Sequence, residues 1–302
     1  MPSALEVAEV QYAAQKELVQ ATAAAGVAMW QQVDPFALTA SWSAWLSRLF
    51  VTLRGAQISA ASNADTFVDD ALRAQGFKPK PEGRVAATAF SRSSSSGGSL
   101  ESLLMGPVIA TKQAIAHGAT VPRAMATGQA RLEMTLRTQV ADASRVAAGV
   151  AVAARPKTGY VRMLVGDSCS RCVILAGQFY PYSSGFERHP QCNCVNMPSR
   201  EDVAGDYTTD PKLAFEQGRV KGLSKADTQA IRDGADMAQV VNAHSGMYVA
   251  GLRKLTTSGT SRSATAGRRL RGAPRAMPEQ IYRDATSREN ALELLRKNGY
   301  LL

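Results

Sequence analysis

The sequence predicts a mainly helical α+β protein that has a small zinc-stabilised β-hairpin and a flexible basic segment near its C-terminus. Apolar residues make up 45% of the 302 residues and aromatic residues only 6%. Many Ala, Leu, Gln and Arg residues favour helices over a β-sandwich. This composition excludes a wholly disordered chain and a disulfide-dense mini-domain, and the chain is long enough to bury a sizeable core.

Residues 1–80 are predicted as a helical N-terminal region. A first helix starts at Ala4 and meets no Gly or Pro before Gly26. A second helix follows Asp34 and Pro35, and its apolar residues recur at three- and four-residue spacing. That stripe carries Trp42, Trp45, Leu46, Leu49 and Leu53. Two tryptophans on one stripe indicate a core or helix–helix contact.

A Ser/Gly-rich stretch, residues 81–98, is predicted as a flexible linker and as a domain boundary. Residues 99–155 then form a second helical region. Its long final helix carries a basic face, for which we favour contact with solvent over contact with nucleic acid. That face consists of Arg123, Arg131, Arg137 and Arg145.

Strands are predicted only within residues 156–200, as a β-hairpin around a zinc knuckle. Residues 160–165 alternate large apolar and other side chains, and residues 178–182 are short and aromatic. A tight turn between them holds two cysteines. Helices resume in residues 201–252, where Ser224 is predicted to cap one of them.

The C-terminal part is predicted as a flexible basic tether, residues 253–278, followed by a docking helix, residues 279–302. The tether has no acidic residue and few large apolar ones. Its basic side chains are candidate nucleic-acid contacts that neutralise phosphates without reading sequence. They are Arg253, Lys254, Arg262, Arg268, Arg269, Arg271 and Arg275.

The charge balance predicts an acidic partner. The 35 Lys and Arg exceed the 25 Asp and Glu by +10, a balance typical of nucleic-acid-binding proteins. The most apolar segment, residues 36–51, is too short and too polar to span a bilayer, so no membrane-spanning segment is predicted. No signal peptide is visible, and we expect synthesis in a reducing cytoplasm.

All four cysteines fall between residues 169 and 194, beside one histidine. In a reducing compartment such a cluster indicates a metal site, and thiolate and imidazole donors favour Zn²⁺. Two disulfides suit a secreted protein, and a thioredoxin-like pair needs a parallel sheet that the sequence does not predict. The candidate ligands for four positions are Cys169, Cys172, His189, Cys192 and Cys194. The spacing leaves open whether all four cysteines bind or whether His189 replaces Cys192 or Cys194.

The cysteine motif resembles the signature of the phage head-morphogenesis family, the minor capsid proteins named after the F protein of phage Mu. The matching strings are Asp167-Ser-Cys-Ser-Arg-Cys172, Ala176-Gly177 and His189-Pro-Gln-Cys192-Asn-Cys194. Residues 233–243 and 278–300 are similar to such proteins of actinobacterial tailed phages. The resemblance implies a minor protein of the virion, at the portal vertex or capsid interior. Its implied partners are the portal or major capsid protein and packaged double-stranded DNA.

No enzyme is predicted. The sequence lacks His-Glu-x-x-His, Gly-x-Ser-x-Gly and a phosphate-binding Gly-rich loop. A closed zinc site keeps no position for water and is structural. The alternatives are a head-maturation protease, with a serine nucleophile and His117 or His244 as base, and a cytoplasmic zinc-knuckle regulator that binds nucleic acid.

Overall fold

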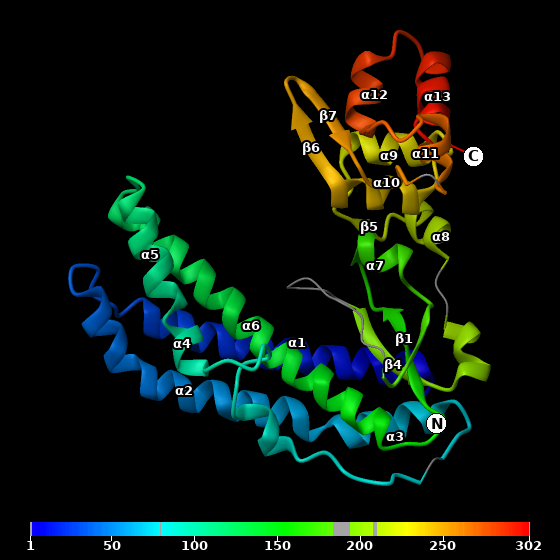
Figure 1. Cartoon of the computed structure of the whole chain (residues 1–302). Coiled ribbons are helices and arrows are strands. Elements are labelled where there is room, and N and C mark those ends of the chain that lie inside the picture. Colours follow the sequence, from blue (N-terminus) through cyan, green and yellow to red (C-terminus); the bar gives the residue numbers. More distant parts are fainter. Residues whose placement is uncertain (1, 79, 184–193, 208–209, 262, 302) are drawn as a thin grey trace. The chain divides into compact units, whose positions relative to one another are not determined.

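The computed structural model describes residues 2–78, 80–183, 194–207, 210–261 and 263–301 (Figure 1). Two compact units make up the chain. Unit 1 comprises Met1–Val165 and Gly177–Thr208, and unit 2 comprises Gly166–Ala176 and Thr209–Leu302. Both contain helices and short strands, so the prediction of a mainly helical α+β fold is confirmed.

Unit 1 is built on long helices, as predicted for residues 1–80 and 99–155. Helices α1, α2 and α6 pack side by side, and α5 packs on α6 (Figure 1). At the start of α1, Ser3 and Glu6 form a capping box. The elements are α1 (Ala4–Trp30), α2 (Leu38–Ser62), α3 (Ala64–Ala74), η1 (Ala87–Ser91), α4 (Leu100–Leu104), α5 (Gly106–Ala116), α6 (Val121–Ala153) and η2 (Glu201–Tyr207).

Two buried tryptophans anchor the core of these helices. The rings of Trp30 on α1 and Trp42 on α2 meet edge to face, with centroids 5.1 Å apart. Each indole N–H donates to a backbone carbonyl, Trp30 to Met125 at 3.1 Å and Trp42 to Leu104 at 2.9 Å. Gly128 on α6 permits this packing, because a Cβ there would lie 2.5 Å from the Trp30 ring. The apolar stripe is therefore core, as its spacing predicts.

The predicted linker, residues 81–98, lies within unit 1 and packs against α6, so the boundary between the units does not fall there. Ser91 and Ser94 are buried. The Ser95 amide donates to the Gln139 side chain at 2.8 Å, and the Gln139 amide donates back to the Ser95 hydroxyl at 2.9 Å. Ser95 is thus paired with a side chain of α6, a partnership that composition alone does not indicate.

The predicted β-hairpin is present and gains a third strand. Strand β1 (Gly159–Leu164) pairs antiparallel with β3 (Phe179–Pro181) and, on its other side, with β4 (Cys194–Ser199). Tyr160 on β1 stacks on Tyr180 on β3, with centroids 5.9 Å apart. The sequence prediction missed β4, whose Pro198 argues against a strand by composition.

Unit 2 is built from short elements. Its two small sheets are a parallel β2–β5 pair and an antiparallel β6-β7-β8 sheet (Figure 1). The helix cap predicted at Ser224 is present, as a capping box with Asp227. The elements are β2 (Ser168–Cys169), α7 (Ser170–Ile174), α8 (Pro211–Glu216), β5 (Val220–Lys221), α9 (Lys225–Arg232), α10 (Met237–Ala243), η3 (His244–Gly246), β6 (Met247–Ala250), β7 (Arg253–Thr256), α11 (Thr265–Arg269), β8 (Arg275–Ala276), α12 (Pro278–Asp284) and α13 (Arg288–Lys297).

The C-terminal residues complete the core of unit 2. Leu295 on α13 and Tyr300 beyond it are fully buried beside Ile281 on α12 and Val240 on α10. The docking helix predicted for residues 279–302 is thus two helices, and they dock on their own unit. The N-cap of α13 is Ser287, whose hydroxyl accepts a hydrogen bond from the Asn290 amide.

The prediction of a flexible tether over residues 253–278 is wrong for the described residues. β7 pairs with both β6 and β8, and α11 lies between β7 and β8 in sequence. The buried Thr256 hydroxyl donates to the Ala243 carbonyl at 2.6 Å. The segment has few large apolar residues, and backbone pairing and buried polar groups contribute to its order.

Candidate functional site

The Cys-x-x-Cys motif lies at the start of α7 in unit 2. Cys169 ends β2 and caps α7, and its Sγ accepts the Cys172 amide at 3.4 Å. The β2–β5 pairing supports this turn, and an ion pair of 2.9 Å joins Asp167 to Lys221 beside it. An amide that donates to the first sulfur stabilises the thiolate form, which is the form that binds metal. The turn therefore suits a metal ligand pair.

The other predicted ligands lie on the segment that leads into β4. Cys194 is the first residue of β4, is buried, and stands opposite Leu164 on β1. His189 and Cys192 lie outside the described residues. In the part of the chain that the structure describes, no group of three or more His, Cys, Asp or Glu side chains is arranged to hold a metal. The described donors fit zinc chemically, and the full ligand set remains a prediction.

Arg275 is not a nucleic-acid contact, contrary to the sequence prediction. Only 1% of its surface is exposed, and its guanidinium lies 4.1 Å from the centre of the Tyr300 ring. It donates to the Asn298 carbonyl at 2.7 Å and to the Ser258 carbonyl at 3.1 Å. Burial lowers the pKa of this guanidinium. Arg275 is therefore a structural residue of unit 2.

The remaining predicted contacts fall into two groups. Arg253 pairs with Asp284 at 3.1 Å and Lys254 with Glu279 at 3.4 Å, so neighbouring carboxylates neutralise both. The second group consists of Arg268, Arg269 and Arg271, which are exposed on and after α11. Arg262 lies outside the described residues.

One of the two candidate histidines has an acidic partner. His244 Nε2 lies 3.0 Å from Asp227 Oδ2, and this carboxylate is buried while 41% of the His244 side chain is exposed. The hydrogen bond to Asp227 raises the pKa of His244 above 6.5, against the opposing effect of burial. Burial alone raises the pKa of Asp227, but the bonds from His244 and Ser224 outweigh it and lower that pKa below 3.8.

This arrangement holds the imidazole in one orientation, as an acidic partner does for a catalytic base. The sequence prediction named His244 as a candidate base but not its partner Asp227. His117 ends α5 on the surface, and no ion pair among the described residues involves it.

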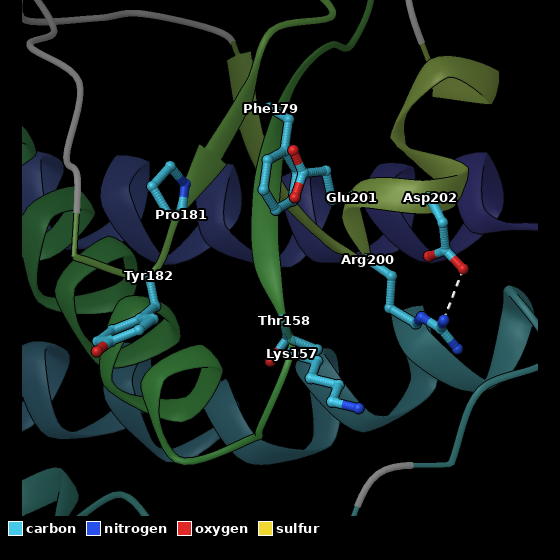
Figure 2. Close-up of a pocket in the computed structure, with 8 residues that line it drawn as sticks. All are labelled: Lys157, Thr158, Phe179, Pro181, Tyr182, Arg200, Glu201 and Asp202. Atoms are coloured by element: carbon cyan, nitrogen blue, oxygen red, sulfur yellow. Dashed lines mark hydrogen bonds and ion pairs between the residues drawn. The ribbon is translucent and has the colours of Figure 1, made fainter.

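A hollow of about 630 Å³ opens beside β3 in unit 1 (Figure 2). Its charged groups partly neutralise one another, since Arg200 pairs with Asp202 at 2.6 Å and also lies over the Phe77 ring at 4.8 Å. Sequence reasoning did not find this hollow, because its lining comes from three separate segments. The lining residues are Lys157, Thr158, Phe179, Pro181, Tyr182, Arg200, Glu201 and Asp202. These described lining residues include no histidine or cysteine.

No protein-family model, curated protein or solved structure matches the chain. In the described residues, no helix combines the length and apolar character needed to cross a membrane.

Proposed function

We propose that this protein is a minor capsid protein of a tailed phage that acts by binding during head assembly and genome delivery. The observation that carries the proposal is the cysteine signature between Asp167 and Cys194. The turn geometry at Cys169 and Cys172 supports it, because the Cys172 amide donates to the Cys169 sulfur and such a bond stabilises a thiolate ligand. Its partners would be the portal or major capsid protein and packaged DNA.

The metal proposed for this signature is Zn²⁺, held by four of the donors Cys169, Cys172, His189, Cys192 and Cys194. Bound zinc would act as a structural cross-link, worth roughly 10–16 kcal/mol in small zinc modules. Thiolate and imidazole ligands that fill all four positions leave none for water, so the site would not be catalytic.

The proposed contact with DNA is supported by the distribution of charge. Unit 2 carries 17 Lys and Arg against 10 Asp and Glu, a net +7 out of the chain's +10. A basic surface of this kind attracts nucleic acid through its phosphates. It does not require a sequence-reading element.

The direct test is quantitative mass spectrometry of purified particles. We expect the protein in the virion at a few copies, and we expect the Cys169→Ser variant to be incorporated poorly while Ser170→Ala is incorporated normally. Absence of the wild-type protein from particles would contradict the proposal. Sequence-specific DNA binding combined with that absence would favour the zinc-knuckle regulator.

A head-maturation protease is the second candidate, and the His244–Asp227 pair is the observation that favours it. Co-expression with scaffold and coat proteins tests this candidate. If these proteins are cleaved with the wild type and with His117→Ala but not with His244→Ala, the protease replaces the binding protein as the preferred function. Under our proposal, no cleavage depends on His244.

A further inference from the structure

Several basic side chains of unit 2 have partners inside the unit, and among the others one group lies close together at α11 and the end of α13. Arg171 donates to the Ser245 hydroxyl and Arg283 to the Leu252 carbonyl. Acidic partners neutralise Lys221, Arg253, Lys254 and Arg288. By contrast, no ion pair in residues 210–261 and 263–301 engages the basic residues of α11, of the turn after it, or of the last turn of α13.

We call this group the α11–α13 patch, and it consists of Arg268, Arg269, Arg271, Arg296 and Lys297. All five are exposed. The nearest acidic residue on α13, Glu293, lies one turn before Lys297. Sequence reasoning named the first three and missed Arg296 and Lys297, because only the fold brings the end of α13 beside α11.

Close packing fixes the two halves of the patch together. Gly299 after α13 has φ +72°, and a Cβ there would lie 2.7 Å from the Ala266 Cβ on α11. Arg269 donates to the carbonyls of Arg296 and Leu301. These bonds neutralise the negative C-terminal end of α13, which would otherwise repel an anion. Arg269 thus links α11 to the end of α13, and the other four cations are available to a ligand.

Arg271 holds a backbone conformation that favours glycine. Its φ is +52°, and an L-residue in the left-handed region costs about 1 kcal/mol relative to glycine. The structure therefore keeps a cation at a position where glycine is the more stable choice. Local strain of this kind is typical of residues retained for function.

We propose that the α11–α13 patch is a binding site for the backbone of duplex DNA, in which Arg268, Arg271, Arg296 and Lys297 contact phosphates without reading sequence. The proposal rests on the proposed function, because packaged DNA is the polyanion that a capsid-interior protein meets. An acidic surface of a capsid protein is the competing ligand, and the test below distinguishes the two.

The test is fluorescence anisotropy of the full-length protein with a labelled 20-base-pair duplex of random sequence, titrated between 50 and 200 mM NaCl. Four phosphate contacts predict a slope of log affinity against log salt of about −4. The double variant Arg268→Gln/Arg271→Gly should lower the slope to about −2 and weaken binding roughly 60-fold at 0.1 M salt. The matched control is Lys212→Gln/Lys225→Gln, which removes two exposed cations on α8 and α9.

We expect the control to bind within about threefold of the wild type, since its charges act only at a distance. Equal losses of DNA affinity in both double variants would overturn the proposed DNA site. The same conclusion would follow if the wild type had no measurable affinity for DNA at 50 mM NaCl. Thermal unfolding confirms folding, because Arg271→Gly relieves strain and should not lower the midpoint. If DNA affinity is unchanged in the patch variant but incorporation into particles is lost, the ligand is a capsid protein. Normal incorporation with no DNA binding would overturn the patch while leaving the proposed function intact.

Discussion

Unit 1 and the C-terminal half of unit 2 obtain their order in different ways. In unit 1, long helices bury apolar stripes around Trp30 and Trp42. In unit 2, residues 253–278 have few large apolar side chains, and buried polar groups such as Arg275 and Thr256 hold them in place. The comparison teaches that a segment without an apolar pattern can still be folded when its backbone and polar side chains find partners within the unit.

The largest expected effect is in the tryptophan core of unit 1. Replacing Trp42 by Ala should destabilise unit 1 by about 3–5 kcal/mol, because it leaves a cavity and an unpaired Leu104 carbonyl. Urea unfolding monitored by far-ultraviolet circular dichroism measures this loss. Phe36→Ala, at a side chain that is 91% exposed, is the control and should stay within about 0.5 kcal/mol of the wild type. Equal effects would mean that the stripe is not core.

The next largest effect is expected at Arg275. The Arg275→Met variant leaves a buried carbonyl acceptor, of Asn298, and a half-buried one, of Ser258, without their donor and should cost about 2–4 kcal/mol. Limited trypsin digestion followed by mass spectrometry should show residues 253–278 protected in the wild type and cleaved in this variant. Arg268→Met, on the surface, should leave the protection unchanged. Rapid cleavage of this segment in the wild type would contradict its folded structure and support the flexible tether predicted from composition.

A smaller effect is expected from the capping boxes at the start of α9 in unit 2 and of α1 in unit 1. Ser224→Ala removes the hydroxyl that accepts the Asp227 amide at the start of α9, and it should lower the free energy of unfolding by about 1 kcal/mol. Ser3→Ala at the matching capping box of α1 should cost less, since that box is exposed at a chain end. Thermal unfolding of the two variants measures both. A larger loss at Ser3 would contradict the greater dependence of unit 2 on polar groups.

The smallest effect is the pH dependence of the His244–Asp227 pair, which should contribute less than about 1 kcal/mol because the imidazole is partly exposed. The raised pKa of His244 adds stability at low pH, and this contribution is lost as pH rises through that pKa, above 6.5. The lowered pKa of Asp227 adds stability above about pH 3.8, and this is lost as pH falls through that pKa.

The His244→Gln variant should therefore differ most from the wild type between about pH 4 and 6.5, as measured by thermal unfolding across pH. The matched control is His117→Gln, which should follow the wild-type profile. A difference that peaks above pH 8 would contradict the charged pair.

Periodic apolar spacing predicted the helices of unit 1, and capping residues predicted α9, because both signals are local in the sequence. The partners of Ser95 and Arg275 could not be predicted, since Gln139 and Asn298 reach them only through the fold. The same holds for the candidate sites. The cysteine motif and Arg268 were visible in the sequence, whereas Asp227 beside His244, and Lys297 beside α11, depend on how separate segments pack.

The central claim is that the cysteine signature binds one zinc ion, and elemental analysis of the purified full-length protein tests it most directly. We predict one equivalent of zinc per chain in the wild type and in Ser170→Ala, and clear loss of zinc in Cys169→Ser. The contradicting result would be wild-type protein that contains no zinc and is nevertheless folded, as shown by its circular dichroism and by a cooperative thermal unfolding transition. That result would also contradict the proposed function.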